Sequence, residues 1–162
     1  LSGLAEGQLD MAVLSGFGVE LGKGLDSRVT LSDPCMVMIS ASHPLAAKKE
    51  IHPRELKGMP IVLNRAQDSQ PSAGLIAGMY ANMGLRENKR MYADDFYSIA
   101  LIINTGIAFS IMPASVACWG IDGVVFRPVQ GFKAKARTLL VYPRGSQDTG
   151  IQSFVSLIRP KR

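Results

Sequence analysis

The chain has 162 residues, of which 47% are hydrophobic and 19% charged, and its formal net charge is +5. This apolar content is enough to bury a core in one domain or two small lobes, so disorder is excluded as the general interpretation. The positive charge alone does not indicate a nucleic-acid surface, because the basic residues are scattered and are not interleaved with aromatic ones. No apolar run reaches the ~18 residues of a membrane span and no secretory leader is present, so we expect a cytoplasmic protein without a membrane partner.

The first third of the chain predicts a short helix followed by strands. Residues 1–5 resemble the last turns of an amphipathic helix, and 9–14 predict a strand that stops at Ser15 and Gly16. A Gly-rich loop follows, and then two separate strands over 29–31 and 35–39. Because the chain opens on the end of a helix, we expect it to be a fragment of a longer protein.

The middle of the chain alternates helices with strands. A short helix starts near Pro53 and closes at Gly58, and 60–63 predict a strand. After the polar stretch 64–72, a helix is expected over 73–83. A short strand and a helix over 96–104 follow, with Asp94 or Asp95 as the N-cap of that helix.

The apolar run LIINTGIAFSIMPASVA, residues 101–117, is interrupted by residues that break helices. Gly and Pro cost roughly 1 and 3 kcal/mol inside a helix, so one continuous helix is not expected. Gly106 fits a left-handed helix end, 107–111 a strand covered on both faces, and Pro113 the first turn of another helix. The run therefore predicts helix, turn, buried strand and helix.

Two strands and a helix complete the pattern. The segments GVVFRPV and ARTLLVYPRG predict the strands, and the closing helix is expected to be amphipathic, with Ile151, Phe154, Val155 and Ile158 on one face. Strands that alternate with helices indicate an α/β fold with parallel sheets.

Ligands of such folds bind beyond the carboxyl ends of the strands. The segments at these ends supply neutral hydrogen-bonding groups and one guanidinium suited to a carboxylate. From spacing alone, an ordinary exposed loop is a slightly better interpretation of the polar stretch than a binding site. The candidate ligand-binding residues are Ser15, Gly16, Phe17, Asn64, Arg65, Gln67, Ser69, Asp95, Phe96 and Thr105.

No enzyme signature is found in the sequence. Dinucleotide, Walker, nucleophile-elbow and zinc-protease motifs are missing, so no cofactor, metal or catalytic residue is predicted. His43 and His52 each precede a proline, which favours a role at a turn or helix entry. Cys35 and Cys118 lie in apolar surroundings and are expected to be buried free thiols, with one disulfide as the alternative.

Four segments together resemble one family. They are LAEGQLDMAVL, VMISASHPLAAKKEIHPRELKGMPIVL, IALIINTGIAFSIMPASVA, and the closing strand with its Phe-containing helix. Their order along nearly the whole chain is similar to that of the C-terminal effector-binding region of LysR-type transcriptional regulators. This resemblance reverses the preference above and favours the polar stretch as part of a binding site.

The resemblance implies a fold and a function. The fold is α/β and periplasmic-binding-protein-like (type 2), with mixed, mainly parallel sheets and two lobes joined by crossover strands over 35–40 and 138–142. Lobe I would comprise 1–34 and 140–162, without its first strand, helix and strand, and lobe II would comprise 35–139. A small effector, anionic if Arg65 contacts it, would bind between the lobes. In the full-length protein, which would form dimers or tetramers, DNA would be bound only by an N-terminal domain outside this sequence.

Two other functions stay open. A periplasmic solute-binding protein of a transport system would share the fold and would carry a secretory leader. An enzyme built on the same scaffold would need a nucleophile, base or metal site that the sequence does not reveal.

Overall fold

A computed structural model describes residues 1–16, 20–68 and 73–158 of the chain. By its internal contacts the chain divides into two units. Unit 1 comprises 1–33 and 136–162, and unit 2 comprises 34–135. The division places both chain ends in the same unit.

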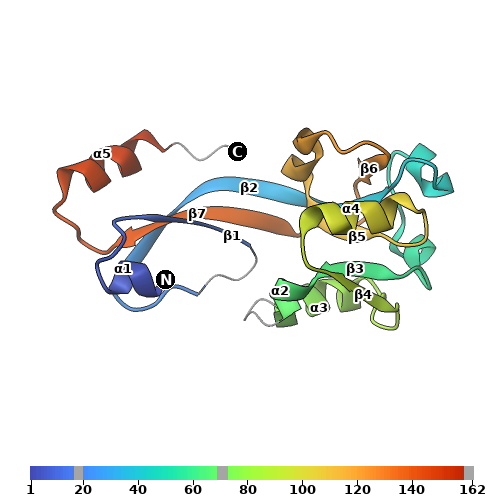
Figure 1. The fold of residues 1–162 in the computed structure, drawn as a ribbon, viewed down its shortest axis with the longest axis horizontal. Helices are drawn as coiled ribbons and strands as arrows, with labels where there is room; N and C mark the ends of the chain where they lie inside the picture. Colours follow the sequence, from blue (N-terminus) through green and yellow to red (C-terminus); the bar gives the residue numbers. More distant parts are fainter. Residues whose placement is uncertain (17–19, 69–72, 159–162) are drawn as a thin grey trace. The chain divides into compact units, whose positions relative to one another are not determined.

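Unit 1 is built on three neighbouring strands (Figure 1). Strand β7 (Lys135–Pro143) lies between β1 (Ala12–Gly16) and the first part of β2 (Leu25–Ser40). The β1–β7 pair is antiparallel, with Ala12 opposite Val141. β1 starts three residues later than the pattern predicted, and Ser15 and Gly16 belong to the strand.

Two helices accompany these strands, α1 (Ser2–Ala5) and α5 (Thr149–Leu157). Leu4 of α1 packs with Leu25 and Val141 in a small core. Helix α5 starts at Thr149, because Asp148 accepts a hydrogen bond from the Ile151 amide and so acts as its N-cap.

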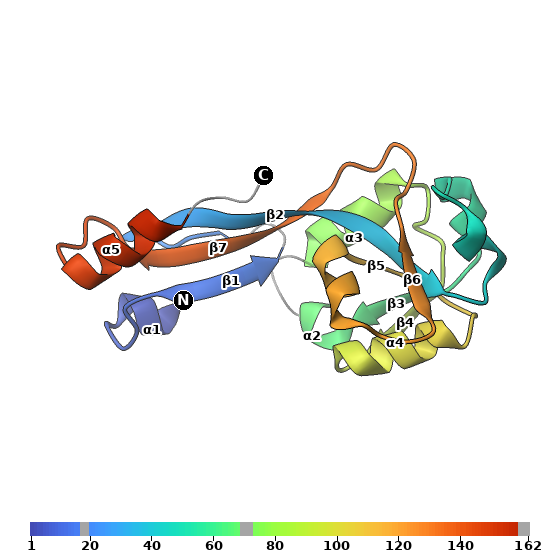
Figure 2. The ribbon, with the colours of Figure 1, turned by 90° about the horizontal axis from the view of Figure 1, so that it is seen from above.

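Unit 2 contains the second part of β2 and four shorter strands (Figure 2). β2 is flanked by β5 (Ser110–Pro113) and β6 (Val124–Arg127), both antiparallel to it. β3 (Ile61–Asn64) and β4 (Arg90–Ala93) pair in parallel. A parallel bridge between Ile61 and Phe109 connects β3 to the chain just before β5.

Short helices surround these strands, and a core of apolar side chains fills the space between them. The core joins β2, β3 and β4 to one face of helix α4 (Phe96–Asn104), through Met38, Val62, Ala93, Ile99, Ala100, Ile103 and Ala108. The helical elements of unit 2 are η1 (Pro44–Ala47), η2 (Pro53–Leu56), α2 (Arg65–Asp68), α3 (Ala73–Asn82), α4 (Phe96–Asn104) and η3 (Ala114–Trp119).

The prediction of separate strands over 29–31 and 35–39 was wrong, because both lie in the single 16-residue strand β2. Pro34 lies between the two predicted runs and is exposed within this strand. Proline is tolerated where the strand does not need its amide as a donor. The adjacent Cys35 amide donates to the Ala134 carbonyl at 3.0 Å, so hydrogen bonding resumes at once.

The expected predominance of parallel pairing is not observed among the described strands. β3–β4 forms a parallel ladder, whereas β1–β7, β2–β5 and β2–β6 are antiparallel. Alternation of helices and strands predicts parallel neighbours only when successive strands occupy one sheet in turn. Here β2 and β7 run through or out of unit 2, and the short strands pair against the direction of β2.

The apolar run 101–117 forms three successive elements in the structure. Helix α4 ends before Gly106, whose φ of 82° confirms the predicted left-handed turn. The following strand begins at Ser110, three residues later than predicted, and Ile107 is exposed. Pro113 ends that strand and is the N-cap of the 3-10 helix η3, one position before the predicted first turn.

Neither Cys35 nor Cys118 forms a disulfide in the described part of the chain, and Cys35 is buried. Cys118 is exposed on η3, which corrects the expectation of two buried thiols. A 3-10 helix has three residues per turn, so η3 buries Val116 and leaves Cys118 on its outer side. None of the helices in the described ranges has the length and apolar character that a membrane span requires.

Candidate functional site

The ends of β3 and β4 form the polar cluster that we call the strand-end site. These strands are parallel, and Asn64 lies opposite Ala93, so both carboxyl ends meet at one edge. The chain continues from β3 into α2 and from β4 into α4. This arrangement brings together four of the predicted residues, Asn64, Arg65, Asp95 and Phe96.

Asn64 and Arg65 both have partners inside the site. The Asn64 side-chain oxygen accepts a hydrogen bond from the Ala66 amide at 2.8 Å and so supports the start of α2. The Arg65 Nε donates to Asp94 Oδ1 at 2.8 Å, and its guanidinium lies 5.9 Å from the centre of the Tyr92 ring. Because the ion pair is exposed, it contributes little to stability, and a ligand carboxylate can compete with Asp94 for this cation.

Asp95, one of the two residues that the sequence offered as N-cap, is the N-cap of α4. Its carboxylate accepts hydrogen bonds from the Ser98 amide at 2.9 Å and from the Ser98 hydroxyl at 2.8 Å. The backbone hydrogen bond from Ser98, followed by that from its side chain, lowers the pKa of Asp95 below its ordinary value. Asp95 therefore serves first to start the helix that carries Phe96.

The lowered pKa of Asp95 predicts a pH-dependent contribution to stability. The carboxylate stabilises the fold above its ordinary pKa of 3.8, and this contribution is lost as the pH falls through the lower pKa of the folded state. In Asp95→Asn the amide keeps the capping acceptor but does not titrate. We expect the wild type to lose more unfolding free energy than the variant between about pH 6 and about pH 3 in urea titrations. Parallel pH profiles for the two proteins would contradict this.

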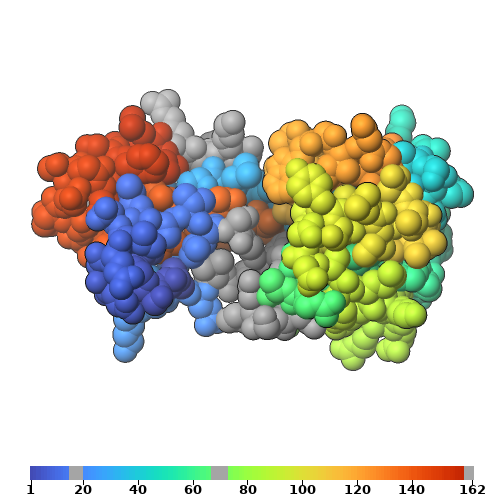
Figure 3. Space-filling model, in the orientation of Figure 1, coloured from blue at the N-terminus to red at the C-terminus, as the bar shows by residue number. Residues whose placement is uncertain are grey.

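Phe96 lies against an aromatic residue that the sequence did not single out. The Phe96 and Trp119 rings are 4.7 Å apart at an angle of 81°, an edge-to-face arrangement. Figure 3 shows α4, in yellow, next to η3, in orange, on one face of unit 2. Trp119 is more than half exposed. Because it lies far from Phe96 in the sequence, no local pattern predicted that it would reach the strand-end site.

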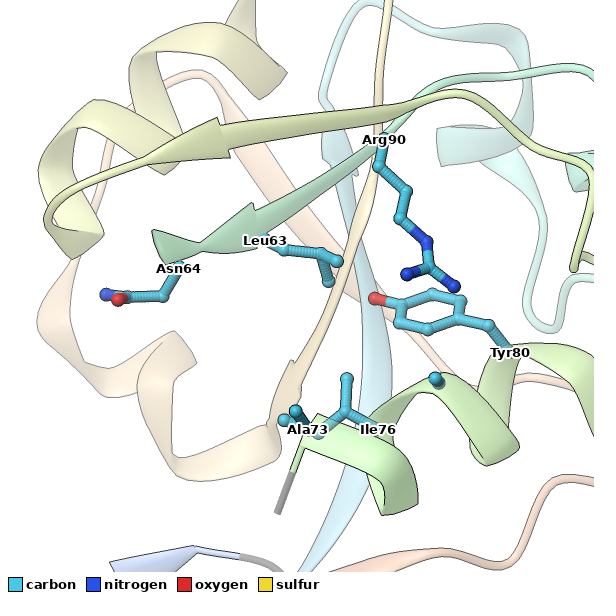
Figure 4. A pocket seen from close by; sticks show the side chains of 7 residues that line it. Leu63, Asn64, Ala73, Ile76, Tyr80 and Arg90 are labelled. Carbon is cyan, nitrogen blue, oxygen red and sulfur yellow. The ribbon is translucent and has the colours of Figure 1, made fainter. Parts of the chain in front are cut away.

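A small pocket lies under β3, between this strand and α3 (Figure 4). Leu63, Tyr80 and Arg90 line it, and the Asn64 side chain points away from Tyr80 and Arg90. The Tyr80 hydroxyl accepts a hydrogen bond from the Ile111 amide at 3.1 Å, and burial raises the pKa of Tyr80 to about 12. The pocket has a volume of about 10 Å³, which is enough for about one water molecule, so the pocket alone cannot hold an organic ligand.

The other predicted site residues lie elsewhere or outside the description. Thr105 is the C-cap of α4, and an α-helix rises ~1.5 Å per residue, so it lies roughly 15 Å along the axis from Asp95. The structure therefore does not bring Thr105 into the strand-end site. Ser15 and Gly16 end β1 in unit 1, and Gln67 lies in α2. Phe17 and Ser69 lie outside the described residues.

Both histidines have the helix-entry role that the sequence predicted. His43 Nδ1 accepts a hydrogen bond from the Leu45 amide, and His52 Nδ1 accepts one from the Arg54 amide. Glu55 completes a capping box at His52. Within the described residues, no group of three or more His, Cys, Asp or Glu side chains is placed to hold a metal ion.

Comparison with curated proteins finds transcriptional regulators. The chain is 21% identical over 137 residues to the Hca operon transcriptional activator HcaR of Escherichia coli K12, covering 85% of this chain and 46% of that protein. It is 20% identical over 158 residues to the HTH-type transcriptional regulator BudR of Raoultella terrigena, covering 95% and 53%. The chain thus spans about half the length of the curated relatives it matches.

Comparison with solved structures shows the fold. The BenM effector-binding domain with its effector benzoate superposes with a TM-score of 0.81 at 19% identity, covering 98% of this chain and 71% of that one. The effector-binding domain of QuiR in complex with shikimate gives 0.74 at 18%, covering 96% and 72%. These domains have the type 2 periplasmic-binding-protein-like fold, which confirms the predicted fold class. A family model described as LysR substrate binding domain matches residues 1–162, and the chain therefore belongs to the LysR substrate-binding domain family.

Proposed function

We propose that this chain is the effector-binding part of a LysR-type transcriptional regulator and that its effector is a small organic anion. Unit 1 and unit 2 would be the two lobes, and the strand-end site of unit 2 would contact the effector. The observation that carries the proposal is the strand-end site of a LysR-family chain, where Arg65, Tyr92 and the start of α4 converge. Ser15, Gly16 and Phe17 would contribute from unit 1, and Gln67 and Ser69 from the polar stretch of unit 2.

The chemistry of the strand-end site supports an anionic effector. Arg65 offers a planar fork of donors that matches a carboxylate, and Tyr92 offers an aromatic surface beside it. BenM binds benzoate and QuiR binds shikimate, and both of these compounds carry a carboxylate on a six-membered ring. In this chain Arg65 forms an ion pair with Asp94, so the effector would have to displace the exposed Asp94 carboxylate.

Opposite substitutions in the ion pair test the proposal. Isothermal titration of the full-length regulator would use ring carboxylates such as benzoate and shikimate, with benzamide as a neutral control. Arg65→Gln is expected to weaken carboxylate binding by about tenfold or more, because a charge-assisted pair is lost. Asp94→Asn is expected to tighten it by about two- to fivefold, because the competing anion is removed.

Arg86→Gln is the matched control, since Arg86 is an exposed cation outside the strand-end site and should change the affinity by less than about twofold. If Arg65→Gln and Arg86→Gln have equal effects, or if Asp94→Asn weakens binding, the assignment of the site is wrong. If none of the carboxylates binds while a neutral compound does, the anionic effector is excluded and effector binding itself is retained.

Effector binding would regulate transcription by favouring one relative arrangement of the lobes. Only a difference in affinity between two arrangements can shift their populations. The shift would pass through subunit contacts of a dimer or tetramer to a DNA-binding domain outside this chain, in the cytoplasm. Membership in a family of transcriptional regulators supports this function over a periplasmic transport receptor and over an enzyme.

A further inference from the structure

Unit 2 has a second, larger pocket that shares no residue with the strand-end site. It lies between η2, α3 and the segment that leads into β7, and its volume is about 350 Å³. Ligand pockets of proteins have volumes of roughly 300–1,000 Å³, so this one fits a small organic molecule. The lining residues that matter here are Pro53, Met79, Met83, Gln130, Phe132 and Lys133.

The wall formed by residues 130–134 is held in place by backbone hydrogen bonds. The Gln130 amide donates to the Ile51 carbonyl at 2.9 Å, and the Ile51 amide donates to the Pro128 carbonyl at 3.0 Å. Ile51 itself is fully buried. At the other end of the wall, the Ala134 carbonyl accepts a hydrogen bond from the Cys35 amide. The pocket is therefore formed before a ligand arrives, which lowers the entropic cost of binding.

The body of the pocket is apolar and adaptable. Met79 lies on α3 and Met83 follows four residues later, so both thioethers line the same side. Phe132 and Pro53 add further apolar surface to the lining. Methionine side chains are flexible and polarisable and adjust to ligands of different shape. These walls suit an aryl or alkyl group better than a sugar.

One cation stands at the rim of this pocket. Lys133 is exposed and forms no ion pair with any carboxylate of the described residues. Arg65, in contrast, is paired with Asp94. No Asp or Glu lines the pocket. An ammonium group on an apolar cavity complements a ligand with one negative charge and an apolar body.

We infer that this pocket is a second small-molecule site, specific for amphipathic carboxylates that place an apolar chain or ring against Met79, Met83 and Phe132 and the carboxylate at Lys133. The inference goes beyond the proposed function and does not depend on the strand-end site. A ligand bound here contacts the segment that continues directly into β7.

Methyl NMR of the protein labelled at its methionine methyl groups tests this inference, with 4-phenylbutyrate as the probe. The chain has 8 methionines, of which two line the pocket, so the others report on binding elsewhere. Saturable shifts are expected for the Met79 and Met83 resonances, assigned by Met→Leu substitutions. Lys133→Gln should raise the dissociation constant for 4-phenylbutyrate by about fivefold and should leave that for the neutral 4-phenylbutanol unchanged.

Lys135→Gln is the matched control, because Lys135 is an exposed lysine two residues away that does not line the pocket. It should change the dissociation constant by less than about twofold. Absence of saturable shifts at Met79 and Met83, or equal effects of the two lysine substitutions, would overturn the inference. Arg65→Gln should leave the Met79 and Met83 shifts unchanged, so failure at this pocket and failure at the strand-end site are distinguished.

Discussion

Asn88→Ala is expected to lower the free energy of unfolding by about 2–4 kcal/mol, because it removes the two hydrogen bonds that the Asn88 side chain donates to backbone carbonyls of unit 2. Asn88 is only 7% exposed. Its side-chain nitrogen donates to the Leu56 carbonyl at 2.6 Å and to the Met59 carbonyl at 2.8 Å. These bonds fix the turn that leads from η2 into β3, and thereby the start of the strand that ends at Asn64. Urea unfolding followed by circular dichroism measures the change.

Asn82→Ala serves as the control for this prediction. Asn82 is the last residue of α3 and is exposed, so its replacement should change stability by no more than about 0.5 kcal/mol. Equal stability losses in the two variants would show that the Asn88 hydrogen bonds do not hold the turn.

Gly123→Ala is expected to cost about 2–3 kcal/mol, from backbone strain and a steric clash together. Gly123 has a φ of 80°, a conformation that residues with a Cβ adopt at a cost. A Cβ added there would lie 2.3 Å from the Asn104 side-chain oxygen at the end of α4. The Asn104 side chain would have to rotate away. Denaturant unfolding of the single variant gives the sum of both effects.

Two further variants separate the contributions at Gly123. Gly106 has nearly the same φ of 82° and open space around its added Cβ, so Gly106→Ala should show only the conformational cost of about 1–2 kcal/mol. In an Asn104→Ala background, Gly123→Ala should fall to that same cost. If the loss at Gly123 persists unchanged in this background, the clash with Asn104 does not contribute.

Local sequence signals predicted the elements whose ends are marked by specific side chains. Asp95 started α4, His43 and His52 started 3-10 helices, and Gly106 ended α4 with the expected left-handed backbone. Each of these depends on hydrogen bonds or dihedral angles within a few residues of the chain. Such interactions are determined by neighbouring residues and are therefore readable before the fold is known.

Sequence patterns gave wrong predictions for segments whose pairing or packing partners lie far away in the chain. Two strands were predicted over 29–31 and 35–39 where the structure has the single strand β2, because its continuity depends on pairing with distant segments of the chain. The strand after Gly106 starts only at Ser110, where the chain meets β2. Cys118 was placed in the core because its neighbours are apolar, although η3 turns it outward.

In the strand-end site, too, the local features were predicted and the long-range contacts were not. Its residues Asn64, Arg65 and Asp95 were found from strand ends and a helix cap, which are local features. That Arg65 binds Asp94, that Tyr92 lies beside it, and that Trp119 packs on Phe96 all required the tertiary structure. The separation of Thr105 from the site also follows only from the length of α4.

The order of residues was sufficient to identify the α/β class, the family, the ends of α4 and the starts of η1 and η2. Periodicity, turn residues and capping side chains act over short distances and leave a direct record in the order of residues. Strand direction, the continuity of β2 and the pairing of Arg65 with Asp94 became visible only in the folded chain. The pocket lined by Met79 and Lys133 was also not predictable from the sequence. Strand pairing, ion pairs and pockets all depend on which distant segments of the chain pack together.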